Sequence, residues 1–159
     1  MLMYINDMSP NEIEAYAKTV QEPERSTFFS LLTQEFELTD NPAKRNSLAM
    51  LLADNAKEMA LEPIIRMIKN PKAHNSRGTL LYALNDLDYD DHLEYLFTLI
   101  YDDSFEVKRE AFMLIEKAFE HKNISDDIIK RQISLAVNAV KQLQSDMDFY
   151  VSVLELLSK

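Results

Sequence analysis

The chain has 159 residues and a mass of 18.5 kDa, and 47% of its residues are hydrophobic and 28% charged. These values are typical of a globular protein that is long enough to bury a core of its own. A single glycine, Gly78, and the absence of cysteine exclude glycine-rich phosphate loops, nucleophile elbows, disulfides, cysteine–zinc sites and iron–sulfur clusters. The net charge of −10 argues against a protein that binds the phosphate backbone of nucleic acids.

The first residues do not form a targeting segment by the usual criteria. Residues 1–5 are apolar, but no positive residues precede them and Asp7 ends the run after a few positions. A stretch this short is neither a signal sequence nor a membrane span. We therefore expect a cytoplasmic protein with no membrane partner.

The first predicted helix begins at Ser9. Pro10 follows at the first helical position and Glu12 stands three residues after Ser9, which is the pattern of a capping box. Ile13 and Ala17 then start an apolar stripe at helical spacing. Further helices are predicted at about 23–38, from Pro42 onward, and at 57–69, 76–87, 91–101, 104–120, 125–144 and 146–158. The predicted fold is all-α, with eight or nine helices.

An apolar pattern at positions i, i+1, i+3 and i+4 repeats along the chain. Its successive steps are 20, 16, 16, 16 and 15 residues, and a step of 16 corresponds to one helix and a short turn. The copies begin at Phe28, Leu48, Ile64, Leu80, Leu96 and Ala111. Basic residues precede four of these copies by three positions: Arg25, Arg45, Arg77 and Lys108. The pattern predicts a buried core that includes Phe28, Leu31, Leu48, Leu52, Ile64, Ile68, Leu81, Leu84, Leu96, Ile100, Phe112 and Ile115.

The segment from Asp103 through Val107-Lys108 into Ala111 and Phe112 resembles the start of the first helix of a HEAT repeat. Asn41-Pro42 to Arg45 and Asn70-Pro71 to Arg77 are poorer copies. The resemblance is clearest over 41–120, with 1–40 and 121–159 as atypical capping helices. It implies a single domain over 1–159, built as a short right-handed superhelix of helix pairs. It also implies a protein-binding scaffold as the commonest use.

The acidic residues are distributed unevenly. Residues 78–107 contain eight acids and no Lys or Arg, whereas residues 41–77 contain three acids and seven bases. Four of the seven tyrosines also lie in the acidic block, and tyrosine is favoured at protein interfaces. The predicted partner-binding residues are Asp86, Asp88, Asp90, Asp91, Glu94, Tyr95, Thr98, Tyr101, Asp102 and Asp103. The alternative interpretation is a solvated helix face with acidic helix starts.

Other interpretations of these residues are weaker. Asp86, Asp88 and Asp90 alternate as in a calcium loop, but Asp91 and Phe97 occupy the positions that require glycine and glutamate. The three histidines are scattered, so no catalytic or metal site and no cofactor is predicted. The basic block (Lys44, Arg45, Lys57, Arg66, Lys69, Lys72 and Arg77) could contact phosphate, but the net charge argues against a nucleic-acid partner.

Together these features predict a non-catalytic binding protein. An acidic solenoid of this size suits an inhibitor of a basic protein, such as a bacterial immunity protein that occupies the basic surface of a nuclease toxin. Two alternatives remain. One is a general HEAT-like scaffold or adaptor in a cytoplasmic complex. The other is an enzyme, because a minority of HEAT-like proteins are DNA glycosylases or phycobilin lyases.

Overall fold

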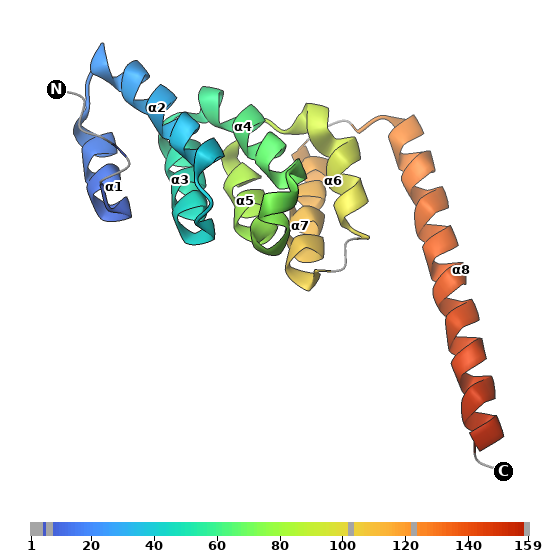
Figure 1. Cartoon of the computed structure of the whole chain (residues 1–159). Helices are drawn as coiled ribbons and strands as arrows, with labels where there is room; N and C mark the ends of the chain where they lie inside the picture. The colour runs from blue at the N-terminus through green and yellow to red at the C-terminus, as the bar shows by residue number, and fades with distance from the viewer. Residues whose placement is uncertain (1–4, 6–7, 102–103, 122–123, 158–159) are drawn as a thin grey trace. The chain divides into compact units, whose positions relative to one another are not determined.

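The computed structural model describes residues 5, 8–101, 104–121 and 124–157. Over these residues the fold is all-α, as predicted, with eight α-helices and, between α4 and α6, three short 3₁₀ turns. The helices are α1 (Pro10–Thr19), α2 (Glu24–Leu38), α3 (Pro42–Asn55), α4 (Lys57–Lys69), α5 (Arg77–Ala83), α6 (Leu93–Leu99), α7 (Phe105–His121) and α8 (Asp126–Leu157) (Figure 1). The 3₁₀ turns cover Pro71–Ser76, Leu84–Asp86 and Asp90–His92.

Side-chain caps start several of these elements. The hydroxyl of Ser9 accepts the Glu12 backbone N–H, and the Glu12 carboxylate accepts the Ser9 backbone N–H at 2.8 Å, which confirms the predicted capping box of α1. The Asn41 side chain accepts the backbone N–H groups of Ala43 and Lys44, with Pro42 at the first position of α3. These bonds satisfy donors that have no partner within the helix.

Contacts between helices follow an alternating order in the unit Met1–Lys117. Helix α3 packs against both α1 and α5, and α2 packs against α4. Each helix from α2 to α4 also contacts the next one in the chain (Figure 1). The odd-numbered helices α1, α3 and α5 therefore lie beside one another, and so do α2 and α4.

Nine of the twelve predicted core residues are buried. The exceptions are Leu31 and Ile100, which are half-buried, and Phe112, which is 52% exposed. The prediction for Phe112 is wrong because it rested on the repeated apolar pattern, which does not show which face of the helix is covered. In α7 the buried side chains are Val107, Ala111, Leu114, Ile115 and Ala118, so Phe112 lies on the opposite face.

Two basic residues of the repeat hold chain turns together. Arg45 is 1% exposed, and its guanidinium donates to the carbonyls of Thr39 at 3.2 Å and Lys72 at 3.4 Å and to the Ser76 hydroxyl at 3.4 Å. These acceptors lie after α2 and in the turn before α5. Arg25 donates to the carbonyls of Ala17 and Asn55. Both guanidiniums thus satisfy carbonyl groups that helix ends leave without partners.

Helix α8 differs from the prediction. The sequence predicted two helices with a break near residue 145, whereas α8 is continuous over 32 residues. The side-chain amides of Gln142 and Gln144 donate to Asp146 at 3.0 Å and Asp148 at 3.1 Å, across the expected break. Such i,i+4 bonds stabilise a helix, and residues 124–157 contain no glycine or proline.

By contacts the chain divides into two units, Met1–Lys117 and Ala118–Lys159, and the boundary falls inside α7. The expectation of a single domain over 1–159 stays a prediction.

Candidate functional site

The predicted partner-binding strip centres on α6 and the turns around it. Leu93, Leu96 and Phe97 point into the core of the unit Met1–Lys117 and are buried. On the other side, Asp91, Glu94 and Thr98 are exposed, and Tyr101 is 45% exposed. The apolar spacing predicts that Leu93, Leu96, Phe97 and Ile100 form the buried side and that Tyr95 turns away from it. The first three are buried as predicted, whereas Ile100 and Tyr95 are both half-buried. Asp102 and Asp103 lie outside the described residues, so the strip considered below consists of Asp91, Glu94, Thr98 and Tyr101.

The preceding turns carry the other predicted acids. Asp86 and Asp88 are exposed and Asp90 is half-buried. The segment is fixed to the core by Leu87 and Tyr89, both buried. The Tyr89 hydroxyl donates to the carbonyl of Leu114 at 2.9 Å. Tyr89 is thus a packing residue that ties this segment to α7, and it does not contribute to an exposed surface.

Two basic residues from other helices approach the acidic block. The Lys117 ammonium from α7 lies 3.6 Å from the Asp86 carboxylate and donates to the carbonyl of Asn85 at 2.6 Å. The Lys69 ammonium at the end of α4 lies 4.6 Å from the centre of the Tyr95 ring. The folded surface is therefore less acidic here than the segment 78–107 alone suggests. The counts within that segment could not reveal this, because both bases lie far away in sequence.

These contacts distinguish Tyr95 from Tyr101, the two tyrosines among the predicted partner-binding residues. Tyr95 is half-buried and its ring already receives a cation, an arrangement that stabilises the ring's present position. Tyr101 keeps nearly half of its surface exposed. Tyr101 is consequently the better candidate for insertion into a partner. Tyr82, which is 55% exposed on α5, was missing from the predicted strip.

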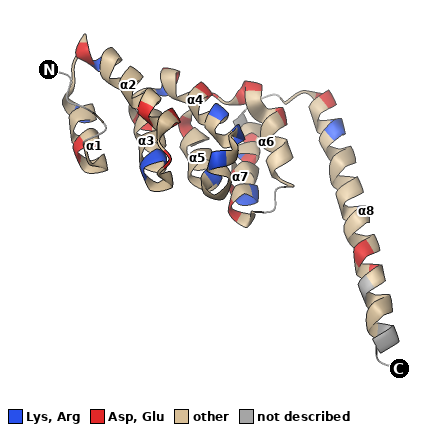
Figure 2. Ribbon diagram, in the orientation of Figure 1, with Lys and Arg blue, Asp and Glu red and all other residues tan. Residues whose placement is uncertain are grey.

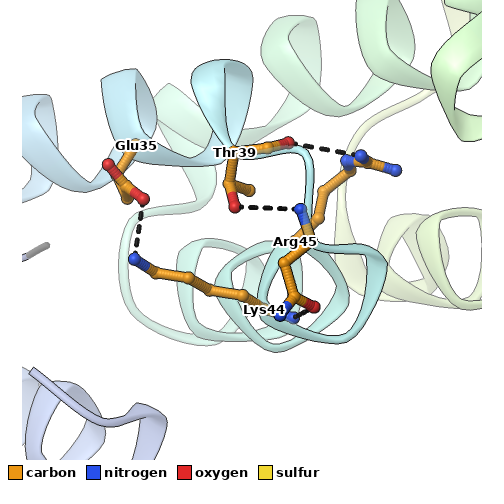
Figure 3. Close-up of polar contacts among 5 residues, drawn as sticks. Glu35, Thr39, Lys44 and Arg45 are labelled. Carbon is orange, nitrogen blue, oxygen red and sulfur yellow. Dashed lines mark hydrogen bonds and ion pairs between the residues drawn. The ribbon is translucent and has the colours of Figure 1, made fainter.

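Much of the basic block serves internal contacts. Lys44 lies 2.7 Å from Glu35 of α2, and both side chains are largely buried (Figure 3). Arg45 is buried beside it and reaches the carbonyl of Thr39 (Figure 3). Arg66 pairs with Glu37 at 2.6 Å. These pairs join α2 to α3 and α4 and lower the positive charge that the block could offer to phosphate. Figure 2 marks the basic and acidic positions along the helices.

The histidines are likewise engaged in local contacts. His92 Nε2 lies 2.9 Å from the Glu62 carboxylate of α4, and His74 Nδ1 lies 2.6 Å from the Arg77 guanidinium. The side chain of His121 lies outside the described residues. Among the residues that the structure describes, no group of three or more His, Asp or Glu side chains is arranged to hold a metal ion.

A cavity of about 350 Å³ lies between the start of α2 and the turn joining α3 to α4. Its lining includes Arg25, Phe29 and Met59. The Arg25 guanidinium there already donates to Ala17 and Asn55 carbonyls and lies 4.7 Å from the centre of the Phe29 ring. The arginine thus acts as a structural link between helix ends.

Comparison with known proteins gives no match among family models, curated sequences or solved structures. Within the described part of the chain, none of the helices is both long enough and apolar enough to span a bilayer. Any functional assignment must accordingly come from the surface described above.

Proposed function

We propose that the chain is a non-catalytic protein-binding module that uses the α6 strip to bind and neutralise a basic protein, such as a nuclease toxin, in the cytoplasm. The observation that carries the proposal is the combination of exposed Glu94 on α6, exposed Asp91 in the turn before it and partly exposed Tyr101 after it, around a helix whose Leu93, Leu96 and Phe97 are buried. Packed aromatic residues surrounded by charges are typical of binding hot spots.

The fold that we propose for this role is a HEAT-like right-handed superhelix of helix pairs. Its support is the alternating contact order, in which α3 joins α1 to α5 while α2 joins α4. Stacked helix pairs produce the same order, because each pair buries its apolar face against the next. Such a stack would present α6, the second helix of its pair, on an extended binding surface.

The charge distribution supports a basic protein over a nucleic acid as the partner. The net charge is −10, and Lys44, Arg45 and Arg66 of the basic block are held in internal contacts. An acidic surface accelerates encounter with a basic one and disfavours polyanions.

The test measures binding to purified basic nuclease domains by surface plasmon resonance at two salt concentrations, together with inhibition of their nuclease activity. Reversing the charges with Asp91→Lys and Glu94→Lys should slow association and flatten its salt dependence. The matched control is Asp54→Lys with Glu58→Lys, which makes the same charge change at exposed acids of α3 and α4. The control pair should leave the association rate near the wild-type value.

Tyr101→Ala should act differently from the charge reversals. Loss of a packed aromatic anchor removes about 2 kcal/mol, which corresponds to dissociation that is roughly 30-fold faster. Tyr101→Phe keeps the ring and should dissociate at nearly the wild-type rate. Unchanged association in the Asp91/Glu94 variant would contradict binding through this strip. Binding without inhibition of the nuclease would favour an adaptor.

A further inference from the structure

Helix α8 carries an apolar stripe that repeats every seven residues. Its members are spaced alternately by four and three positions. Between Met147 and Leu154, Tyr150 occupies the expected position in the sequence. These members are Ile129, Ile133, Ala136, Val140, Leu143, Met147 and Leu154. A straight α-helix drifts away from a strict seven-residue spacing. A stripe maintained for more than three heptads is therefore typical of a helix that winds around another helix.

Most side chains of the stripe are exposed, and Ile129 is half-buried. Ile133, Val140, Leu143, Met147 and Leu154 are each more than half exposed. Val137 and Val151 flank the stripe and are also exposed. The other side of α8 is mostly polar, with exposed Leu135 and Phe149 among its residues. Its polar residues are Ser134, Asn138, Lys141, Ser145, Asp148 and Ser152. Isolated helices with large apolar faces gain stability chiefly by packing that face against another surface.

The size of the stripe is adequate for a stable pair of helices. A helix of 32 residues is about 48 Å long. At roughly 60–120 Å² of apolar area per side chain, seven stripe residues and two flanking valines bury on the order of 800 Å² per copy, which matches a standard protein interface.

The charges of α8 indicate the direction of pairing. After the first turn, the N-terminal half contains Lys130, Arg131 and Lys141 and no acid, whereas the C-terminal half contains Asp146, Asp148 and Glu155 and no base. Lys141 and Asp148 lie on the side of the helix away from the stripe, so these charges act through the separation of a basic and an acidic half along the helix and not through pairs across the seam. Two copies running in opposite directions would place each basic half beside an acidic half. Parallel copies would place like charges together, which is unfavourable. Opposed helix dipoles favour the antiparallel arrangement as well.

From the periodicity, the exposure and the charge pattern together, we propose that α8 is a self-association element that pairs with α8 of a second copy as an antiparallel coiled coil. This interaction is separate from the α6 strip.

The first test is the mass of the full chain in solution, measured by light scattering after size-exclusion chromatography. The expected mass is twice the 18.5 kDa of one chain. Placing charges in the stripe with Val140→Glu and Leu143→Glu should return the mass to one chain. The control Asn138→Glu with Ser145→Glu adds the same charge on the polar side and should remain a dimer. A wild-type monomer, or loss of the dimer in the control as well, would overturn the proposal.

The second test determines the direction of pairing by cysteine cross-linking. Because the native chain contains no cysteine, a thiol cross-linker reacts only at the introduced residues. Two single-cysteine variants are made, Ile133→Cys and Leu154→Cys. A short bismaleimide cross-linker is added to each variant alone and to the two variants co-expressed. In antiparallel pairs the two copies of residue 133 lie about 30 Å apart, so each variant alone should stay uncross-linked and the co-expressed pair should give a cross-linked dimer. Efficient cross-linking of each variant alone would show parallel pairing and overturn the proposal.

Discussion

The buried guanidinium of Arg45 offers the sharpest test of how the helices of the N-terminal unit are held together. Its three hydrogen-bond acceptors come from the end of α2 and the turn before α5, so one side chain links elements on both sides of α3. The Nε atom of Arg45 is buried without a hydrogen-bond partner. Substituting Arg45 therefore removes three interactions and, at the same time, relieves the cost of burying a charge.

The size of the effect follows from these two terms. Hydrogen bonds from a charged donor contribute about 1.5–3 kcal/mol each. The bonds of Arg45, at 3.2–3.4 Å, are at the long end of the range, so the lower values apply. After subtracting the relieved cost of desolvation, Arg45→Ala should lower the free energy of unfolding by about 3 kcal/mol. Arg45→Met retains the packing of the stem and should lower it by about 1–2 kcal/mol.

The assay is urea unfolding followed by circular dichroism, with Arg66→Ala as the control. Arg66 pairs with Glu37 at 2.6 Å, but 59% of its side chain is exposed, and exposed ion pairs contribute about 0–1 kcal/mol. In thermal unfolding, Arg45→Ala should melt about 10 °C below the wild type. A difference of less than about 1 kcal/mol between the Arg45→Ala and Arg66→Ala variants would refute the inference that the guanidinium links the turns.

Two smaller predictions concern α1 and the core. The Ser9 hydroxyl, and to a smaller extent the Ser9 backbone N–H, donate to the Glu12 carboxylate and lower the pKa of Glu12 below 4.5. The ionised carboxylate therefore stabilises α1 fully above pH 4.5, and this stabilisation is lost as the pH falls through the lowered pKa. Ser9→Ala should lower the free energy of unfolding in urea by about 1 kcal/mol at neutral pH. In hydrogen exchange, the variant should lose less protection of α1 than the wild type does between pH 6 and pH 3. The same pH dependence of protection in both proteins would contradict the capping role. Leu84 is fully buried, so Leu84→Ala should lower the free energy of unfolding by about 2–5 kcal/mol. Ile100 is half-buried, so Ile100→Ala should lower it by only about 1 kcal/mol. Equal losses of stability would show that the burial of these two residues is wrongly assigned.

The sequence predicted the N-terminal helices well because their signals are local. Ser9 and Glu12 define the start of α1 within four residues, and Asn41-Pro42 defines the start of α3 in the same way. Burial depends on neighbours that are distant in sequence. Phe112 has the same place in the apolar pattern as the buried Phe29 and Leu81. The face of α7 that it occupies is exposed, and the pattern alone cannot reveal which face a neighbouring helix covers.

The candidate strip was predictable in orientation but not in charge. The spacing of Leu93, Leu96 and Phe97 determined which side of α6 faces outward. The electrostatics required the folded chain, because Lys69 and Lys117 reach the acidic block from α4 and α7. The buried hydroxyl of Tyr89 also became evident only from its bond to Leu114.

These added contacts alter what the acidic block can contribute to binding. A carboxylate that already lies near an ammonium group, as Asp86 does, gains less from a basic partner, because the partner must compete with the existing contact. Asp86 is therefore a poorer candidate for contact with a partner than its exposure suggests. Asp91 and Glu94 are the more effective test of a basic partner, because they belong to the same strip as the partly exposed Tyr101. If a basic protein binds this chain, reversing those two acids should weaken association more than reversing Asp86 and Asp88, although both pairs change the net charge equally.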